Sequence, residues 1–168
     1  FGIPIASPEF SLKRNLNPKH VRILDTTLRD GEQTPGVALR PEDKLRIALA
    51  LEELGVDSIE AGFPITSSGE FLAVKMISKE VRSSEVIALA RTTKDDIDRV
   101  IDADCKAIHL FIATSDIHMK YKLRMSREEV VEKAVDAIEY AKSHGLTIEF
   151  SAEDSTRSDL VFLTRVFQ

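Results

Sequence analysis

The chain has 168 residues, of which 43% are apolar and 30% are charged. This length is enough for one domain with a substantial core, and the composition is that of a soluble globular protein. The 23 basic and 28 acidic residues give a net charge of −5, which argues against a nucleic-acid-binding surface. No apolar run approaches the ~20 residues needed to cross a bilayer, and the start does not resemble a secretory signal.

Cys105 is the only cysteine in the sequence, so an internal disulfide is excluded. A lone thiol fits a reducing cytosol and is more typical of core packing than of a nucleophile. We therefore expect a cytoplasmic protein with no membrane or nucleic-acid partner.

Residues 1–20 hold three of the six prolines and show no sustained periodicity. Within them, Ser7-Pro8-Glu9-Phe10 resembles a cloning-vector linker, and a natural N-terminal arm is the alternative. We expect this arm to precede one folded region at 21–168.

After residue 20, short apolar runs typical of β-strands alternate with segments that have helical periodicity. Ser126 and Glu129 have capping-box spacing, Gly145 is placed to end the helix that they begin, and Pro41 suits a first helical turn. Strands are expected at 21–25, 57–61, 86–90, 106–113 and 147–151. Helices are expected at 41–54, 68–80, 94–103, 126–143 and from about 157.

Regular β-α alternation with nearly continuous apolar strands predicts a parallel sheet buried on both faces. Units of ~30 residues match an eight-unit TIM (β/α)8 barrel, although a five-strand doubly wound sheet would have the same length. Polar residues follow several strands instead of gathering at one switch point, which favours the barrel. The expected fold is therefore α/β, with the first five or so β-α units of a TIM barrel.

The densest polar cluster, at 29–33, follows the first expected strand. The fork of donors on Arg29 suits a carboxylate or a developing oxyanion, and Asp30 could ligate a hard divalent cation. The alternative is a structural salt bridge at the barrel rim. No glycine-rich phosphate loop is present, which argues against nucleotide chemistry.

Three other places carry candidate residues. Glu153 follows Ser151, at the end of the fifth expected strand, and could transfer protons or orient an acyl donor, although a helix-capping cluster is an alternative. His109, on an apolar strand, is either a core histidine or a substrate contact. A basic patch at Tyr121, Lys122 and Arg124 could attract an anionic substrate or a coenzyme A phosphate, although most such patches are solvated surface.

Four segments in order, at 24–36, 60–64, 109–120 and 149–157, resemble one enzyme family. The first reads Leu-Asp-Thr-Thr-Leu-Arg-Asp-Gly-Glu-Gln-Thr-Pro-Gly, and the second Glu-Ala-Gly-Phe-Pro. They are similar to the α-isopropylmalate, citramalate and homocitrate synthases, which belong to the TIM-barrel metallolyase group. The resemblance extends over about residues 21–168.

This resemblance implies an acyltransferase that condenses acetyl-CoA with an α-keto acid on a divalent metal (Mg, Mn or Zn). It implies that Asp30 ligates the metal and that Arg29 stabilises the keto-acid oxygen. It further implies that Glu153 acts in the proton chemistry of acetyl-CoA. The residues expected to bind substrate are Arg29, Gln33, His109 and Ser151.

Residues 60–64 look most like an isopropylmalate synthase, which implies 2-oxoisovalerate as substrate and a role in leucine biosynthesis. Residues 153–160 also resemble homocitrate synthases, and 117–124 resemble citramalate synthases. The family's His-x-His metal pair is absent from this sequence. We therefore expect an N-terminal portion of a homodimeric enzyme that is inactive alone and prone to self-association. A non-catalytic half-barrel module and a lyase relative remain as alternatives.

Overall fold

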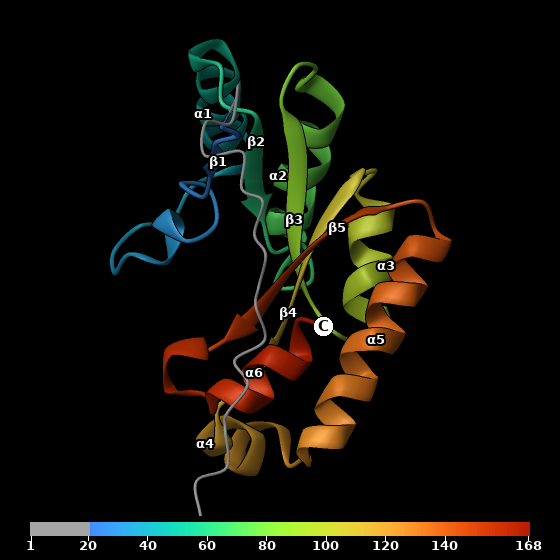
Figure 1. Cartoon of the computed structure of the whole chain (residues 1–168). Helices are drawn as coiled ribbons and strands as arrows, with labels where there is room; N and C mark the ends of the chain where they lie inside the picture. The colour runs from blue at the N-terminus through green and yellow to red at the C-terminus, as the bar shows by residue number, and fades with distance from the viewer. Residues whose placement is uncertain (1–20) are drawn as a thin grey trace, which may run out of the picture.

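The computed structural model describes residues 21–168, so the expected N-terminal arm lies outside the described residues. Its strands form one parallel sheet in which neighbours follow chain order (Figure 1). A doubly wound sheet would reverse its strand order at a switch point, so the sequential order is that of a barrel. The strands are β1 (Leu24–Asp25), β2 (Ser58–Gly62), β3 (Glu85–Arg91), β4 (Ala107–Ala113) and β5 (Thr147–Glu153).

The sheet curls into a half-barrel, with helices packed along its outer side (Figure 1). Each of the four connections between the described strands contains a helix, as expected for parallel crossovers. The helices are α1 (Pro41–Leu54), α2 (Ser68–Glu80), α3 (Lys94–Asp102), α4 (Asp116–His118), α5 (Arg127–Ser143) and α6 (Leu160–Val166). Among the described helices, none is long and apolar enough to span a membrane.

The core lies between the sheet and its helices because alternate strand residues point to opposite faces. The side chains of Ile59, Ala61, Ala88, Ile108 and Leu110 are completely buried in this layer. The intervening positions face the concave side of the half-barrel, and several of them are polar. Both faces of the central strands are buried, as predicted.

Local signals in the sequence set the helix ends. Ser126 Oγ accepts from Glu129 N (3.2 Å), and Glu129 Oε2 accepts from Ser126 N (2.7 Å), which completes the predicted capping box at α5. Gly145 follows that helix with φ +80°, a conformation that glycine adopts without strain. Pro41 occupies the first turn of α1 as predicted.

Two expected boundaries were wrong by about three residues, and one segment without an expected element is helical. The first strand is only Leu24–Asp25, because Ile23 N donates to an Asp57 carboxylate oxygen (2.7 Å) and pairing with β2 starts beyond it. The segment expected as a loop after β4 contains α4 and a π-helical turn, η2 (Met119–Leu123). The last helix begins at Leu160 instead of about 157, because Asp159 Oδ1 caps it by accepting from Phe162 N (2.8 Å).

Cys105 is buried, as predicted for a thiol that packs in the core. Burial raises the pKa of this thiol to about 11, which disfavours the nucleophilic thiolate.

Candidate active site

The carboxyl ends of parallel strands meet at one rim, and the predicted cluster follows β1 there. The carbonyl of Thr26 accepts the N–H groups of Arg29, Asp30 and Gly31 at 3.1, 2.8 and 3.2 Å. This turn ends the strand and leads into a short 3₁₀ helix, η1 (Gly31–Gln33). The chain therefore places Arg29 and Gln33 over the mouth of the half-barrel.

Glu60, in the middle of β2, is completely buried and joins two of the predicted residues. Its carboxylate accepts from Arg29 Nε (2.9 Å) and contacts His109 Nδ1 (2.7 Å). Burial alone would raise the pKa of Glu60, but hydrogen bonds from His109 and Arg29 outweigh it and hold the pKa below its usual value. Glu60 is therefore an ionised anchor for both side chains.

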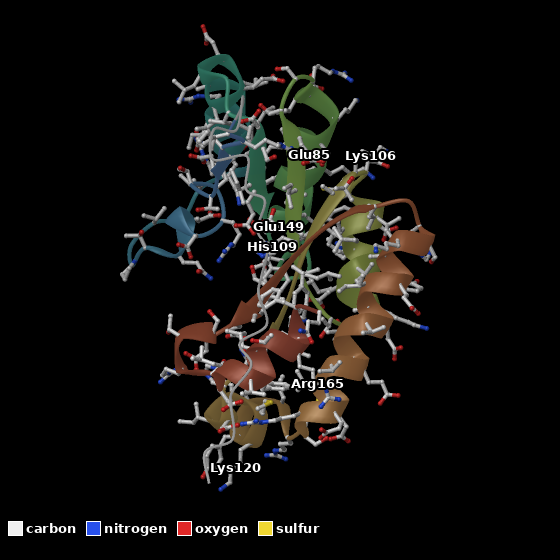
Figure 2. The ribbon with its side chains drawn as sticks, viewed as in Figure 1. Glu85, Lys106, His109, Lys120, Glu149 and Arg165 are labelled. Atoms are coloured by element: carbon white, nitrogen blue, oxygen red, sulfur yellow. The ribbon has the colours of Figure 1, made fainter. Side chains whose placement is uncertain are left out.

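His109 lies on β4 and bridges Glu60 to Ser151 on β5, with Nε2 2.7 Å from the serine Oγ. An ionised carboxylate only accepts hydrogen bonds, so Nδ1–H of His109 donates to Glu60. In the neutral imidazole, Nε2 then accepts from the hydroxyl of Ser151. Figure 2 shows His109 near the middle of the sheet, beside Glu149, its register partner on β5.

A cavity of about 380 Å³ opens on this network at the rim. Its apolar walls come from Phe63, Leu89 and Phe111, and the rings of Phe63 and Phe111 meet edge to face at 6.2 Å. Its polar lining is Arg29, Gln33, His109, Lys122, Ser151 and Glu153. Five of the six residues predicted as site residues therefore line one cavity, although they come from three separate stretches of the chain.

Glu153, at the end of β5, is paired with Lys122. Lys122 Nζ donates to both carboxylate oxygens, at 2.7 and 2.8 Å. Lys122 lies on the π-helical turn η2, a kind of irregularity that is frequent at functional sites. The basic patch after the fourth strand thus supplies one cation to the cavity.

Asp30 is the predicted residue that does not line this cavity. Its side chain is 66% exposed, and Oδ1 accepts from Arg29 Nη1 at 3.2 Å. Within residues 21–168, no three His, Cys, Asp or Glu side chains are grouped closely enough to hold a metal ion. One exposed carboxylate does not make a catalytic metal site, so the described residues do not fit a complete one.

The site residues predicted from the sequence did not include Glu60 or the residues of the apolar walls, Phe63, Leu89 and Phe111. The signal for Glu60 was present, because a carboxylate inside an apolar strand is seldom left unpaired. The apolar walls carried no such signal, since their residue types are equally typical of a core.

Residues 20–168 of this chain match a protein family that is described as HMGL-like. The "Probable 2-isopropylmalate synthase" of Ignicoccus hospitalis is 64% identical over 146 residues, which are 87% of this chain and 37% of that protein. The homocitrate synthase AksA of Methanopyrus kandleri is 55% identical over 151 residues, which are 90% of this chain and 38% of that protein. The chain thus spans a little over a third of these relatives.

Among solved structures, the HMG-CoA lyase of Bacillus subtilis superimposes with a TM-score of 0.72 at 17% identity. The match covers 89% of this chain and 54% of the lyase, and at this identity it supports the fold alone. Together with the parallel half-barrel, it confirms the predicted barrel architecture. The chain therefore belongs to the HMGL-like family, within the group of 2-isopropylmalate, citramalate and homocitrate synthases.

Proposed function

We propose that this chain forms part of an acyltransferase that condenses acetyl-CoA with 2-oxoisovalerate to give 2-isopropylmalate for leucine biosynthesis. The observation that carries the proposal is the single cavity that holds the Arg29 guanidinium, the His109–Ser151 pair and the Glu153 carboxylate. The names of the relatives support the same reaction class. A homodimer and a cytoplasmic location remain predictions.

The proposed reaction gives each polar side chain a separate task. Glu153 takes a proton from the methyl group of acetyl-CoA, and the resulting enolate carbon bonds to the keto carbon. The carbonyl electron pair moves to oxygen, where the Arg29 guanidinium stabilises the developing charge until this oxygen takes up a proton and becomes the product hydroxyl. Water then hydrolyses the thioester and releases coenzyme A. Ser151, His109 and Gln33 hold the keto acid.

The apolar walls favour a branched aliphatic keto acid. The isopropyl group of 2-oxoisovalerate would pack against Leu89, Phe63 and Phe111, whereas the methyl group of pyruvate would leave part of this surface uncovered. The second carboxylate of 2-oxoglutarate would lose its solvation there.

Asp30 is proposed as one oxygen ligand of a divalent metal (Mg, Mn or Zn) in the longer enzyme. Such an ion would polarise the keto carbonyl when bound. The residues described here supply one candidate ligand, so the metal assignment depends on residues contributed by the rest of that enzyme.

The test uses the full-length protein that contains this sequence. It is supplied with acetyl-CoA and one of three keto acids (2-oxoisovalerate, pyruvate or 2-oxoglutarate), and thiol release is followed. We expect the highest kcat/KM with 2-oxoisovalerate. Arg29→Lys keeps the charge but loses the planar fork of donors, and should lower kcat/KM by about 100-fold or more.

Arg46→Lys is the matched control, because Arg46 is an 80% exposed arginine on the outer helix α1 and does not line the cavity. Its kcat/KM should remain near that of the unmodified enzyme. An enzyme that releases no thiol with any of the three keto acids would contradict the proposed reaction. A preference for pyruvate or 2-oxoglutarate would overturn the substrate assignment.

A further inference from the structure

Beside the cavity, the structure buries a lysine that the proposed chemistry does not use. Lys44, in the first turn of α1, is 1% exposed. Its Nζ donates to Glu32 Oε2 at 2.7 Å and to Glu70 Oε1 and Oε2 at 2.7 and 2.9 Å. The three protons of the ammonium group thus match three carboxylate contacts.

The two carboxylates reach further, to the backbone of two loops. Glu32 Oε1 accepts from Leu39 N at 3.1 Å, and Glu70 Oε1 accepts from Phe63 N at 3.0 Å. All four carboxylate oxygens therefore have a donor, although one ammonium faces two negative charges. We call Lys44, Glu32 and Glu70 the Lys44 triad.

The loops joined by the triad form two walls of the cavity. Glu32 lies in η1 directly before Gln33, whose Oε1 accepts from Arg29 Nη1 at 3.4 Å. Phe63 forms the apolar wall after β2. A smaller cavity of about 170 Å³ lies between these walls and is lined by Arg29, Glu32, Gln33, Phe63, Thr66 and Glu70.

Gly62 shows that the triad needs close contact with the end of β2. This glycine has φ +151°, and a Cβ at this position would collide with the Glu70 carboxylate and lie 2.9 Å from Lys44 Nζ. The Glu-Ala-Gly-Phe-Pro segment thus leaves space for the triad as well as supplying Glu60.

We infer that Lys44 is a positioning residue that acts through Glu32 and Glu70. It fixes two segments relative to each other: the loop after β1, which carries Arg29, and the loop after β2, which carries Phe63. A buried network of ion pairs stabilises a fold less than apolar side chains of similar volume would, but it requires a specific geometry of its members. Calling the cavity a substrate site rests on the proposed function, whereas the positioning role concerns only the two loops.

The test compares the chain with Lys44→Met and with the triple variant Lys44→Met, Glu32→Gln, Glu70→Gln. Lys44→Met leaves two half-buried carboxylates without their cation, so we expect a large loss of stability in urea. The triple variant carries no buried charge in the triad, and should recover most of that stability. The two loops should nevertheless be less well fixed than in the unmodified chain, because methionine cannot donate a hydrogen bond to the side chain at position 32 or 70.

Two ligand-free NMR signals report loop position. In the triple variant, we expect the Arg29 Nε–H resonance to broaden or shift and the Phe63 amide to exchange at least about tenfold faster, which reflects loss of local protection. The Ile108 amide in the central strand β4 should keep its exchange rate. Unchanged Arg29 and Phe63 signals in the stable triple variant would overturn the inference.

Single variants keep the test decisive if the triple variant does not fold. Glu70→Gln should speed exchange at Phe63 more than at Leu39, and Glu32→Gln should do the reverse. Equal effects at both amides would contradict a specific link. Lys75→Met is the control, because Lys75 is a 47% exposed lysine on α2 that does not contact the triad. Failure of the full-length protein to release thiol with any of the three keto acids would count against the proposed function and leave these exchange results unaffected.

Discussion

At the scale of single residues, Glu60 is the side chain on which the site geometry depends most directly. It is buried, and it contacts both Arg29 and His109, which come from separate strands or the loops after them. Removing its charge would leave Arg29 without its buried partner and His109 without a fixed tautomer.

We predict that Glu60→Gln lowers the free energy of unfolding by roughly 3 kcal/mol at neutral pH, as measured by urea denaturation. Glu149→Gln is the matched control. Glu149 is a half-buried glutamate on the neighbouring strand β5, and its substitution should have a much smaller effect. Equal losses in the two variants would show that Glu60 has no special structural role.

The stabilising effect of Glu60 should also depend on pH in a defined direction. Its pKa in the folded chain is lowered from the ordinary value of 4.5. The folded state thus binds the proton more weakly, and the stabilisation is complete above pH 4.5 and lost as the pH falls through the folded pKa. The difference in free energy of unfolding between the unmodified chain and Glu60→Gln should therefore shrink as the pH falls below 4.5. A difference that is constant with pH would contradict this.

At the scale of secondary-structure elements, α5 is the helix whose start was most clearly encoded. Its capping box satisfies backbone donors at the first turn without help from the rest of the molecule.

Ser126→Ala should therefore lower the free energy of unfolding by about 1 kcal/mol, measured by urea denaturation. Ser143→Ala, at the other end of the same helix, is the control. Its hydroxyl donates to the Tyr140 carbonyl (2.7 Å) at an exposed position and should matter less. A larger loss in Ser143→Ala than in Ser126→Ala would refute the capping argument.

At the scale of the whole molecule, the half-barrel leaves two sheet edges open. Within the described residues, β1 pairs only with β2 and β5 only with β4. Apolar side chains are exposed near these edges, with Ile23 53% exposed beside β1 and Val161 80% exposed on α6. Unpaired strand edges and exposed apolar surface promote association.

We predict that the isolated 168-residue chain associates in a concentration-dependent manner in sedimentation velocity. Val161→Lys should reduce this association by placing a charge on the exposed face of α6. Leu54→Lys is the control, because Leu54 is similarly exposed at 77% but lies on α1, far from α6 in Figure 1. A chain that remains monomeric at all concentrations would contradict the prediction.

Sequence patterns were enough to predict the order of the elements, most of their ends and the segments that carry the polar residues of the site. These features depend on periodicity, caps and turns, which act over a few residues. The strand β1 and the start of α6 were misjudged because backbone N–H groups donate to the carboxylates of Asp57 and Asp159. The turns after β4 were missed because Met119 packs into an apolar cluster there.

Which of those residues lie together became clear from the folded chain and could not be read from local patterns. Glu60 meets His109 across 49 positions of the chain, and Lys44 meets Glu70 across 26. Such pairs depend on strand register and on the curl of the sheet, which no local pattern specifies. The same curl gathered Arg29, Gln33, His109, Ser151 and Glu153 around one cavity and left the Asp30 side chain outside its lining.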